Sequence, residues 1–145
     1  MGETHVWQTE LQDQRLAQLQ SRSQRELNAF VQHLTTDRRL PRLNMHFRQH
    51  GKDLETTTPE EYELAFLYHI ARDDLRLFTF LRRRELDAVW YLLAEDTGAT
   101  AMYNETAGRY WSFFHISNLQ RFLEESRGRL IELIKTEQRW DIRIW

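Results

Sequence analysis

The sequence predicts an α+β fold with a helical N-terminal half, a three-stranded antiparallel meander at about residues 89–116 packed by helices, a C-terminal helix and a short terminal strand. Apolar residues recur at helical spacing in the first half, and two turns that end in glycine separate aromatic-rich segments in the second. We expect one domain over residues 1–145, because this length suits a single core and no linker, repeat or low-complexity tract interrupts it.

The first third of the chain predicts one long polar helix over about residues 10–35. Thr9 followed by Gln12 gives a capping-box signal at its start. Its apolar residues form a narrow helical stripe that is interrupted at Ser23. A narrow stripe needs a partner surface, so this helix either packs on its own domain or self-associates. The residues we expect to mediate self-association are Leu16, Leu27, Phe30 and Leu34.

Residues 40–51 fit two structures. Leu43, Met45 and Phe47 alternate with polar residues, as in a half-buried strand. Pro41 suits the first position of a helix and Gly51 suits its C-terminal cap. We favour a short helix, because the Asn, His, Arg and Gln residues of this segment have little strand preference.

Two further helices are predicted before the meander. Thr58, Pro59 and the acidic residues behind them mark the start of a helix that runs to about residue 71 and is apolar nearly all round, which is typical of a buried helix. Asp73 or Asp74 then caps a helix over residues 75–81, which leads into the arginine run at 82–84; a strand at 75–81 is the competing interpretation. Acidic residues interleave with the arginines, so we interpret the run as a solvated, ion-paired surface.

The meander has predicted strands at 89–95, 99–104 and 109–116, with turns that end in Gly98 and Gly108. Ser117 with Gln120 predicts the start of a helix toward residue 136. Residues 139–145 alternate apolar and polar side chains and predict a last strand.

Pairing Glu95 with Ala99 and Asn104 with Arg109 makes both faces of this meander apolar. An antiparallel sheet usually leaves one face polar, so something should cover each face here. Either helices cover both faces, or part of one face binds a partner. The residues we expect in that partner surface are Trp90, Trp111, Phe113 and Met102.

Composition and motifs exclude several functional classes. Formal net charge is −2, which argues against a general nucleic-acid binder while leaving a local basic patch open. No apolar run is long enough to cross a membrane, and no secretory signal is evident. The absence of cysteine excludes thiolate chemistry and is compatible with a cytoplasmic protein. No glycine-rich phosphate loop or nucleophile elbow is present, and we expect no cofactor.

Two weak sets of residues carry chemistry. His46 and His50 lie four residues apart, so on a helix they share a face on which a metal could bind with Asp53 or Glu55; surface histidines are the alternative. The second set, Tyr103, Arg109 and His115, contains the residue types of metal-independent ribonucleases. Along one strand, however, Arg109 and His115 are separated by about 20 Å.

If residues 42–48 formed a strand, the order of elements would be similar to that of small RelE-type toxins. No residue motif accompanies that order, and order alone does not carry function, so we assign no family.

The function we expect is that of a non-enzymatic intracellular protein–protein interaction module: an adaptor, inhibitor or regulatory subunit. Its partner is another protein or a second copy of the chain, as in a homodimer. One alternative is a small metal-independent ribonuclease of toxin type, and another is a small-ligand-binding domain.

Overall fold

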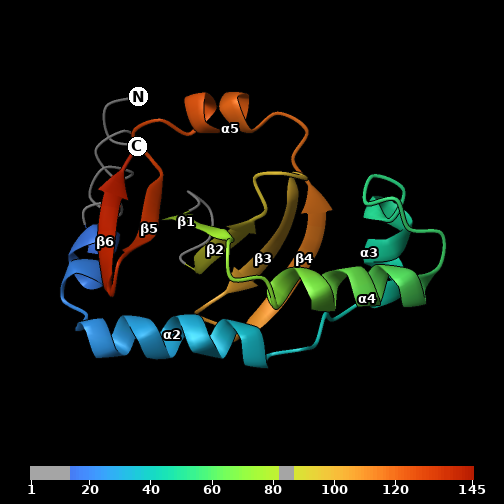
Figure 1. The fold of residues 1–145 in the computed structure, drawn as a ribbon. Coiled ribbons are helices and arrows are strands. Elements are labelled where there is room, and N and C mark those ends of the chain that lie inside the picture. Colours follow the sequence, from blue (N-terminus) through green and yellow to red (C-terminus); the bar gives the residue numbers. More distant parts are fainter. Residues whose placement is uncertain (1–13, 82–86) are drawn as a thin grey trace.

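Six strands form one antiparallel sheet in the order β4-β3-β2-β1-β5-β6 (Figure 1). The computed structural model describes residues 14–81 and 87–145. Strand β1 lies inside the sheet, where it pairs with β2 on one side and β5 on the other. The strand bounds are β1 Arg76–Leu81, β2 Ala88–Leu93, β3 Ala99–Asn104, β4 Arg109–His115, β5 Ile131–Thr136 and β6 Arg139–Ile144.

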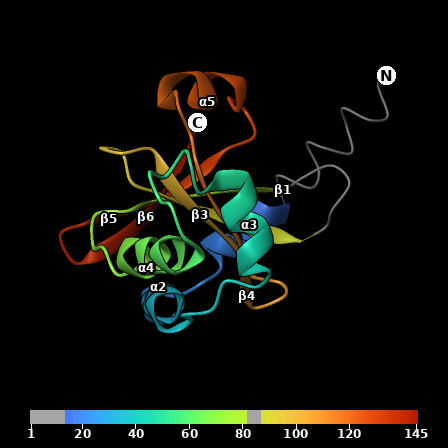
Figure 2. The ribbon, with the colours of Figure 1, turned by 90° about the vertical axis from the view of Figure 1, so that its right-hand side faces the viewer.

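The helices lie on the two faces of this sheet and at one edge. After a helical segment at residues 14–20, α2 (Gln24–Thr36) and α4 (Pro59–Ile70) cover one face, while α5 (Leu119–Glu125) covers part of the other (Figures 1 and 2). Helix α3 (Leu43–His50) lies beside edge strand β4. Side-chain caps start three of these helices: Ser23 for α2, Thr58 for α4 and Asn118 for α5.

The α+β class is confirmed, but the predicted three-stranded meander is wrong. The meander is one part of a six-stranded sheet, and residues 76–81, predicted as a helix, form its strand β1. Leu77 and Phe78 are both buried although they point to opposite faces. An interior strand is apolar on both sides, so its pattern cannot be told from a short buried helix by periodicity.

The predicted helix over residues 117–136 is also wrong in its second half. Helix α5 ends at Glu125, Gly128 takes a left-handed φ of 81°, and β5 follows. Ile131 and Ile134 fit a helical stripe in the sequence, but in the fold they belong to strand β5, which pairs with β1. Sheet pairing over a long sequence separation therefore overrides the local pattern.

The predicted long helix at 10–35 is divided at residues 21–23, where Ser23 caps α2. The start of that helix, its Thr9–Gln12 cap and the arginine run at 82–84 lie outside the described residues. The short helix favoured for residues 40–51 is confirmed as α3, as are the Thr58-capped helix and the terminal strand, observed as β6.

The register of the β2–β3 hairpin differs from the predicted one by one residue. The amide of Ala94, rather than a residue at 95, pairs with Ala99, and Leu93 lies opposite Thr100. Because side chains alternate with period two, this shift exchanges the faces of β2. Trp90 consequently lies with Tyr103 on the face covered by α2 and α4.

Both faces of the sheet are apolar, as predicted. The face toward α2 and α4 carries the larger cluster, which includes Trp90, Tyr103, Tyr110 and Phe113 together with buried residues of both helices. The opposite face carries a smaller cluster that packs against α5; its members include Phe78, Tyr91, Leu93, Phe114 and Phe122. Met102 and Trp111 are only half-buried. In the part of the chain that is described, no helix is long and apolar enough to cross a membrane.

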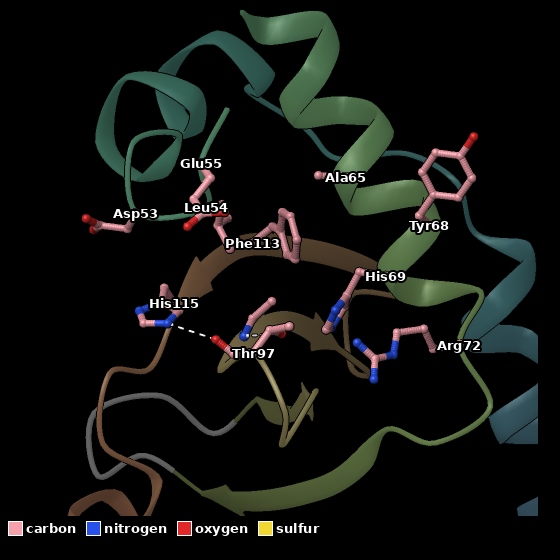
Figure 3. A pocket seen from close by; sticks show the side chains of 11 residues that line it. Asp53, Leu54, Glu55, Ala65, Tyr68, His69, Arg72, Thr97, Phe113 and His115 are labelled. Carbon is pink, nitrogen blue, oxygen red and sulfur yellow. Dashed lines mark hydrogen bonds between the residues drawn. The ribbon is translucent and has the colours of Figure 1, made fainter. Parts of the chain in front are cut away.

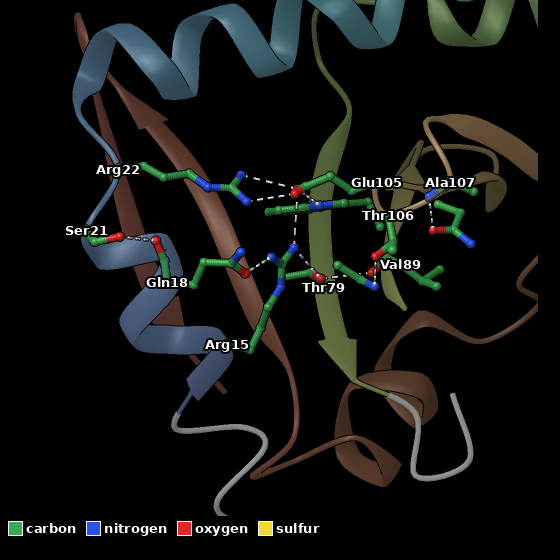
Figure 4. Close-up of polar contacts among 12 residues, drawn as sticks. Arg15, Gln18, Ser21, Arg22, Thr79, Val89, Glu105, Thr106 and Ala107 are labelled. Atoms are coloured by element: carbon green, nitrogen blue, oxygen red, sulfur yellow. Dashed lines mark hydrogen bonds and ion pairs between the residues drawn. The ribbon is translucent and has the colours of Figure 1, made fainter. Parts of the chain in front are cut away.

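A polar cluster ties the N-terminal helical segment to the sheet (Figure 4). Glu105 accepts hydrogen bonds from Arg22 at 2.7 and 3.2 Å and from the Trp90 indole at 2.9 Å, and it pairs with Arg15 at 3.4 Å. Arg15 is 3% exposed and lies over the Trp90 ring. Burial acts to raise the pKa of Glu105, but Arg22, Arg15 and Trp90 outweigh it and hold that pKa below its ordinary value.

We predict that Glu105→Gln lowers the free energy of unfolding at pH 7 by about 2 kcal/mol, because it leaves two arginines without their counter-charge. The folded-state pKa of Glu105 is depressed, so its contribution is present above the unfolded-state pKa and is lost as pH falls through the folded value. Urea unfolding between pH 3 and pH 7 measures both the loss of stability at pH 7 and its dependence on pH. This range covers the transition because a glutamate carboxyl in the unfolded chain has a pKa of about 4.3.

The exposed Glu63 supplies the control for this measurement. Glu63→Gln should leave the free energy of unfolding nearly unchanged at all pH values. Glu105→Gln should instead reduce the amount by which the free energy of unfolding falls between pH 7 and pH 3. Equal effects of the two substitutions would contradict the assigned role of Glu105.

Candidate functional site

The N-terminal end of α3 and the edge of strand β4 enclose a cavity of about 550 Å³. Figure 2 shows α3 lying against β4. We call this the arginine cavity. The residues that carry its chemistry are Arg42, Met45 and His46 from α3 and its cap, Met102 from β3, and Arg109, Trp111 and Ser112 from β4.

A histidine–serine pair lies among the buried residues of the arginine cavity. His46 and Ser112 are each 8% exposed, and Nδ1 of His46 lies 3.4 Å from Oγ of Ser112. Burial, the neighbouring His50 and the charge of Arg42 lower the pKa of His46. The ring is therefore neutral near pH 7, and when Nδ1–H donates to Ser112, Nε2 retains a free lone pair.

The exposed polar side chains of the arginine cavity are cationic. Arg42 and Arg109 are exposed, and neither forms an ion pair or side-chain hydrogen bond with any described residue. Among the described lining residues there is no Asp or Glu. Arg42 also precedes α3 in a left-handed conformation, φ 57°, without a side-chain cap. Helix N-termini attract anions, so these features make the cavity electropositive.

A β-bulge places the aromatic side of the cavity. Tyr103 pairs with Tyr110 and Met102 pairs with Ser112, so Trp111 is the extra residue of strand β4. Bulges re-aim side chains and are frequent beside functional sites. Here the bulge directs Tyr110 into the core beneath α2, where it is fully buried, and leaves Trp111 half-buried at the cavity beside Met102.

The structure separates the predicted partner-binding residues. Trp90 and Phe113 are at most 1% exposed and belong to the core cluster under α2 and α4, so their side chains are not on the surface of the described chain. The register shift in β2 and the bulge in β4 account for this placement. Trp111 and Met102 line the arginine cavity.

The residues predicted for self-association face the sheet of their own chain. Leu27 and Leu34 are 2% exposed in the core, and Leu16 and Phe30 pack against the same cluster. Phe30 contacts the Trp90 ring at a centroid distance of 5.0 Å. The stripe that needed a partner surface therefore has one within the chain.

The three residues predicted for ribonuclease chemistry lie in different places. Arg109 lines the arginine cavity, Tyr103 is buried and packs against Tyr110, and His115 lines a second cavity beyond the C-terminal end of α3. Sequence reasoning missed His46 as the histidine near Arg109. It also missed Ser112, which lies 66 residues from His46 and carries no sequence signal for this contact.

His46 and His50 do share one face of α3, and their rings stack at 6.2 Å. Within residues 14–81 and 87–145, no group of three or more His, Asp or Glu side chains is placed to hold a metal ion. His50 instead contacts the ring of Phe114.

Comparisons with known proteins assign no family to this chain. No protein-family model, no curated protein and no solved structure matches it.

We predict that Arg42→Gln raises the pKa of His46, because it removes a positive charge that disfavours the imidazolium. NMR titration of the His46 ring protons measures this directly. Arg48→Gln is the matched control: Arg48 is an exposed arginine of the same helix that does not line the arginine cavity. Equal shifts in both variants would show a general charge effect and contradict a local interaction between Arg42 and His46.

Proposed function

We propose that this protein is a small ribonuclease that cleaves single-stranded RNA at the arginine cavity without a metal ion. The observation that carries this proposal is the juxtaposition of two arginines that have no carboxylate partner with a buried, neutral histidine. Unpaired arginines recognise phosphate, and a neutral histidine accepts protons near pH 7.

Arg42 and Arg109 are the phosphate-binding residues in this proposal. Their guanidinium groups donate to the non-bridging oxygens of a phosphodiester and balance the charge that grows on them during cleavage. The N-terminal end of α3 adds its partial positive charge from the same side. No carboxylate of the described lining competes for the arginines.

His46 is the general base. Its free Nε2 takes the proton of a ribose 2′-hydroxyl, and the 2′-oxygen attacks phosphorus while the bond to the 5′-oxygen breaks. The leaving 5′-oxygen takes a proton from water, which yields a 2′,3′-cyclic phosphate and a 5′-hydroxyl end. His46 then returns its proton to solvent. Ser112 orients the ring through Nδ1.

Trp111, with Met102 and Met45 beside it, supplies a surface on which a base stacks. Bases of single-stranded RNA can leave their neighbours to reach such a ring, whereas paired bases cannot. This preference supports single-stranded RNA as the substrate class.

Overall charge does not oppose the proposal, because phosphate binding depends on local charge. The chain has a net charge of −2, yet much of its basic charge is paired elsewhere, with Arg22, Arg72 and Arg76 all in ion pairs. The interaction-module function has less support, since Trp90, Phe113, Leu27 and Leu34 are buried within the chain itself.

We predict that the wild-type protein cleaves a short single-stranded RNA in the presence of EDTA and that His46→Ala slows cleavage by about 100-fold or more, the usual loss on removing a general base. Electrophoresis of end-labelled RNA measures the rate, and mass spectrometry identifies the cyclic phosphate. Arg42→Gln and Arg109→Gln should weaken RNA binding and reduce its salt dependence.

His115→Ala is the matched control, because His115 lies in the other cavity. It should cleave RNA at the wild-type rate, and DNA of the same sequence, which has no 2′-hydroxyl, should stay intact. His46→Gln, with thermal unfolding as a check, separates loss of the base from loss of the fold. Undiminished cleavage by folded His46 variants, or no cleavage by the wild type, would refute the proposal.

A further inference from the structure

A second cavity, of about 520 Å³, lies between α4, the segment that follows α3 and the β3 and β4 ends near residues 97–99 (Figure 3). Its polar lining includes Asp53, Glu55, His69, Arg72 and His115. We call this the acceptor cavity. Phe113 lies between His69 and His115 at its centre, and Tyr68 of α4, 75% exposed, lines it as well.

Each of the two histidines forms a hydrogen bond between its Nε2 and a backbone carbonyl. Nε2 of His69 lies 2.8 Å from the oxygen of Leu92, and Nε2 of His115 lies 2.9 Å from that of Thr97. A carbonyl only accepts, so Nε2 carries the proton and a neutral ring keeps an acceptor lone pair on Nδ1. His69 is 5% exposed, and no described group donates to its Nδ1.

Arg72, the cation of this cavity, is already neutralised. Its Nε and Nη2 donate to Asp74 at 2.8 and 2.7 Å, and Nη2 also donates to Asp96 at 2.9 Å. Two carboxylates therefore balance the one guanidinium. Arg72 consequently adds no net positive charge that would attract an anionic ligand.

The carboxylates that line the cavity can still accept hydrogen bonds from a ligand. The side chains of Asp53 and Glu55 form no hydrogen bond or ion pair with a described residue, although the charge of Asp53 acts on His50. Glu55 also holds a left-handed backbone, φ 58°, which is unusual for a residue other than glycine or asparagine. Strained residues of this kind cluster at ligand sites. The free polar groups that the cavity offers to a ligand are thus acceptors: two carboxylates and Nδ1 of the buried His69.

We infer that the acceptor cavity binds an organic cation, a primary amine or an amidinium carried on an apolar or aromatic group. The cation supplies the donors that Glu55, Asp53 and Nδ1 of His69 lack. Its apolar part packs against Leu54 and Ala65 of the cavity lining. This site is separate from the arginine cavity, with which it shares no lining residue.

Benzamidine is the probe for this inference, because it joins an amidinium to a phenyl ring, and benzamide is its neutral control of the same shape. We expect titration with benzamidine, followed by NMR, to shift the resonances of His69, Phe113 and Glu55, whereas benzamide shifts none of them. Glu55→Gln should weaken benzamidine binding by about threefold to fivefold, and the double variant Asp53→Asn, Glu55→Gln by about tenfold.

Two variants separate this result from other causes. Glu60→Gln, which removes an exposed carboxylate outside the cavity lining, should bind benzamidine as the wild type does. His46→Ala should also bind it normally, so the outcome does not depend on the ribonuclease proposal. Equal binding of benzamide, unchanged binding by the folded double variant, or no binding by the wild type would overturn the inference.

Discussion

Strand β1 is paired along both of its edges, and this double pairing holds the fold together. It brings the β2–β3–β4 meander and the β5–β6 hairpin into one sheet. An interior strand has no polar face to offer to water, so both faces of the sheet must be covered. Thr79 is a fully buried polar residue of this strand. Its hydroxyl donates to the carbonyl of Val89, so that the buried hydroxyl is not left without a hydrogen-bond partner.

Buried tyrosines then fix how the helices cover the sheet. The Tyr110 hydroxyl of β4 donates to the carbonyl of Leu34 in α2, and the Tyr62 hydroxyl of α4 donates to the carbonyl of Phe113 in β4. Each bond satisfies a polar group that would be costly to bury alone, and each joins a helix to the edge strand. With α2 and α4 held in this way, α3 lies beside β4, where the bulge at Trp111 and the arginines form a cavity.

The sequence was informative where the signal was local. Thr58 and Pro59 marked the start of α4, and Gly98 and Gly108, both with positive φ, marked the turns of the meander. The sequence was misleading for β1 and β5, because the strand character of Leu77 or Ile131 depends on a partner strand far along the chain. Four residues of the candidate site were singled out from the sequence, but for different roles: Trp111 and Met102 for a partner surface, Arg109 for ribonuclease chemistry and His46 for metal binding. The structure places all four in one cavity.

The sequence by itself determined that the sheet is apolar on both faces, that Thr58 caps α4 and that no cysteine is available for chemistry. Only the tertiary structure decided which aromatic residues are buried and which line a cavity. A one-residue change of register exchanges the faces of a strand, and a single extra residue in β4 redirects the side chains on either side of it. Such shifts leave hydrophobic content and local preference almost unchanged, so they are set by how the elements pack together.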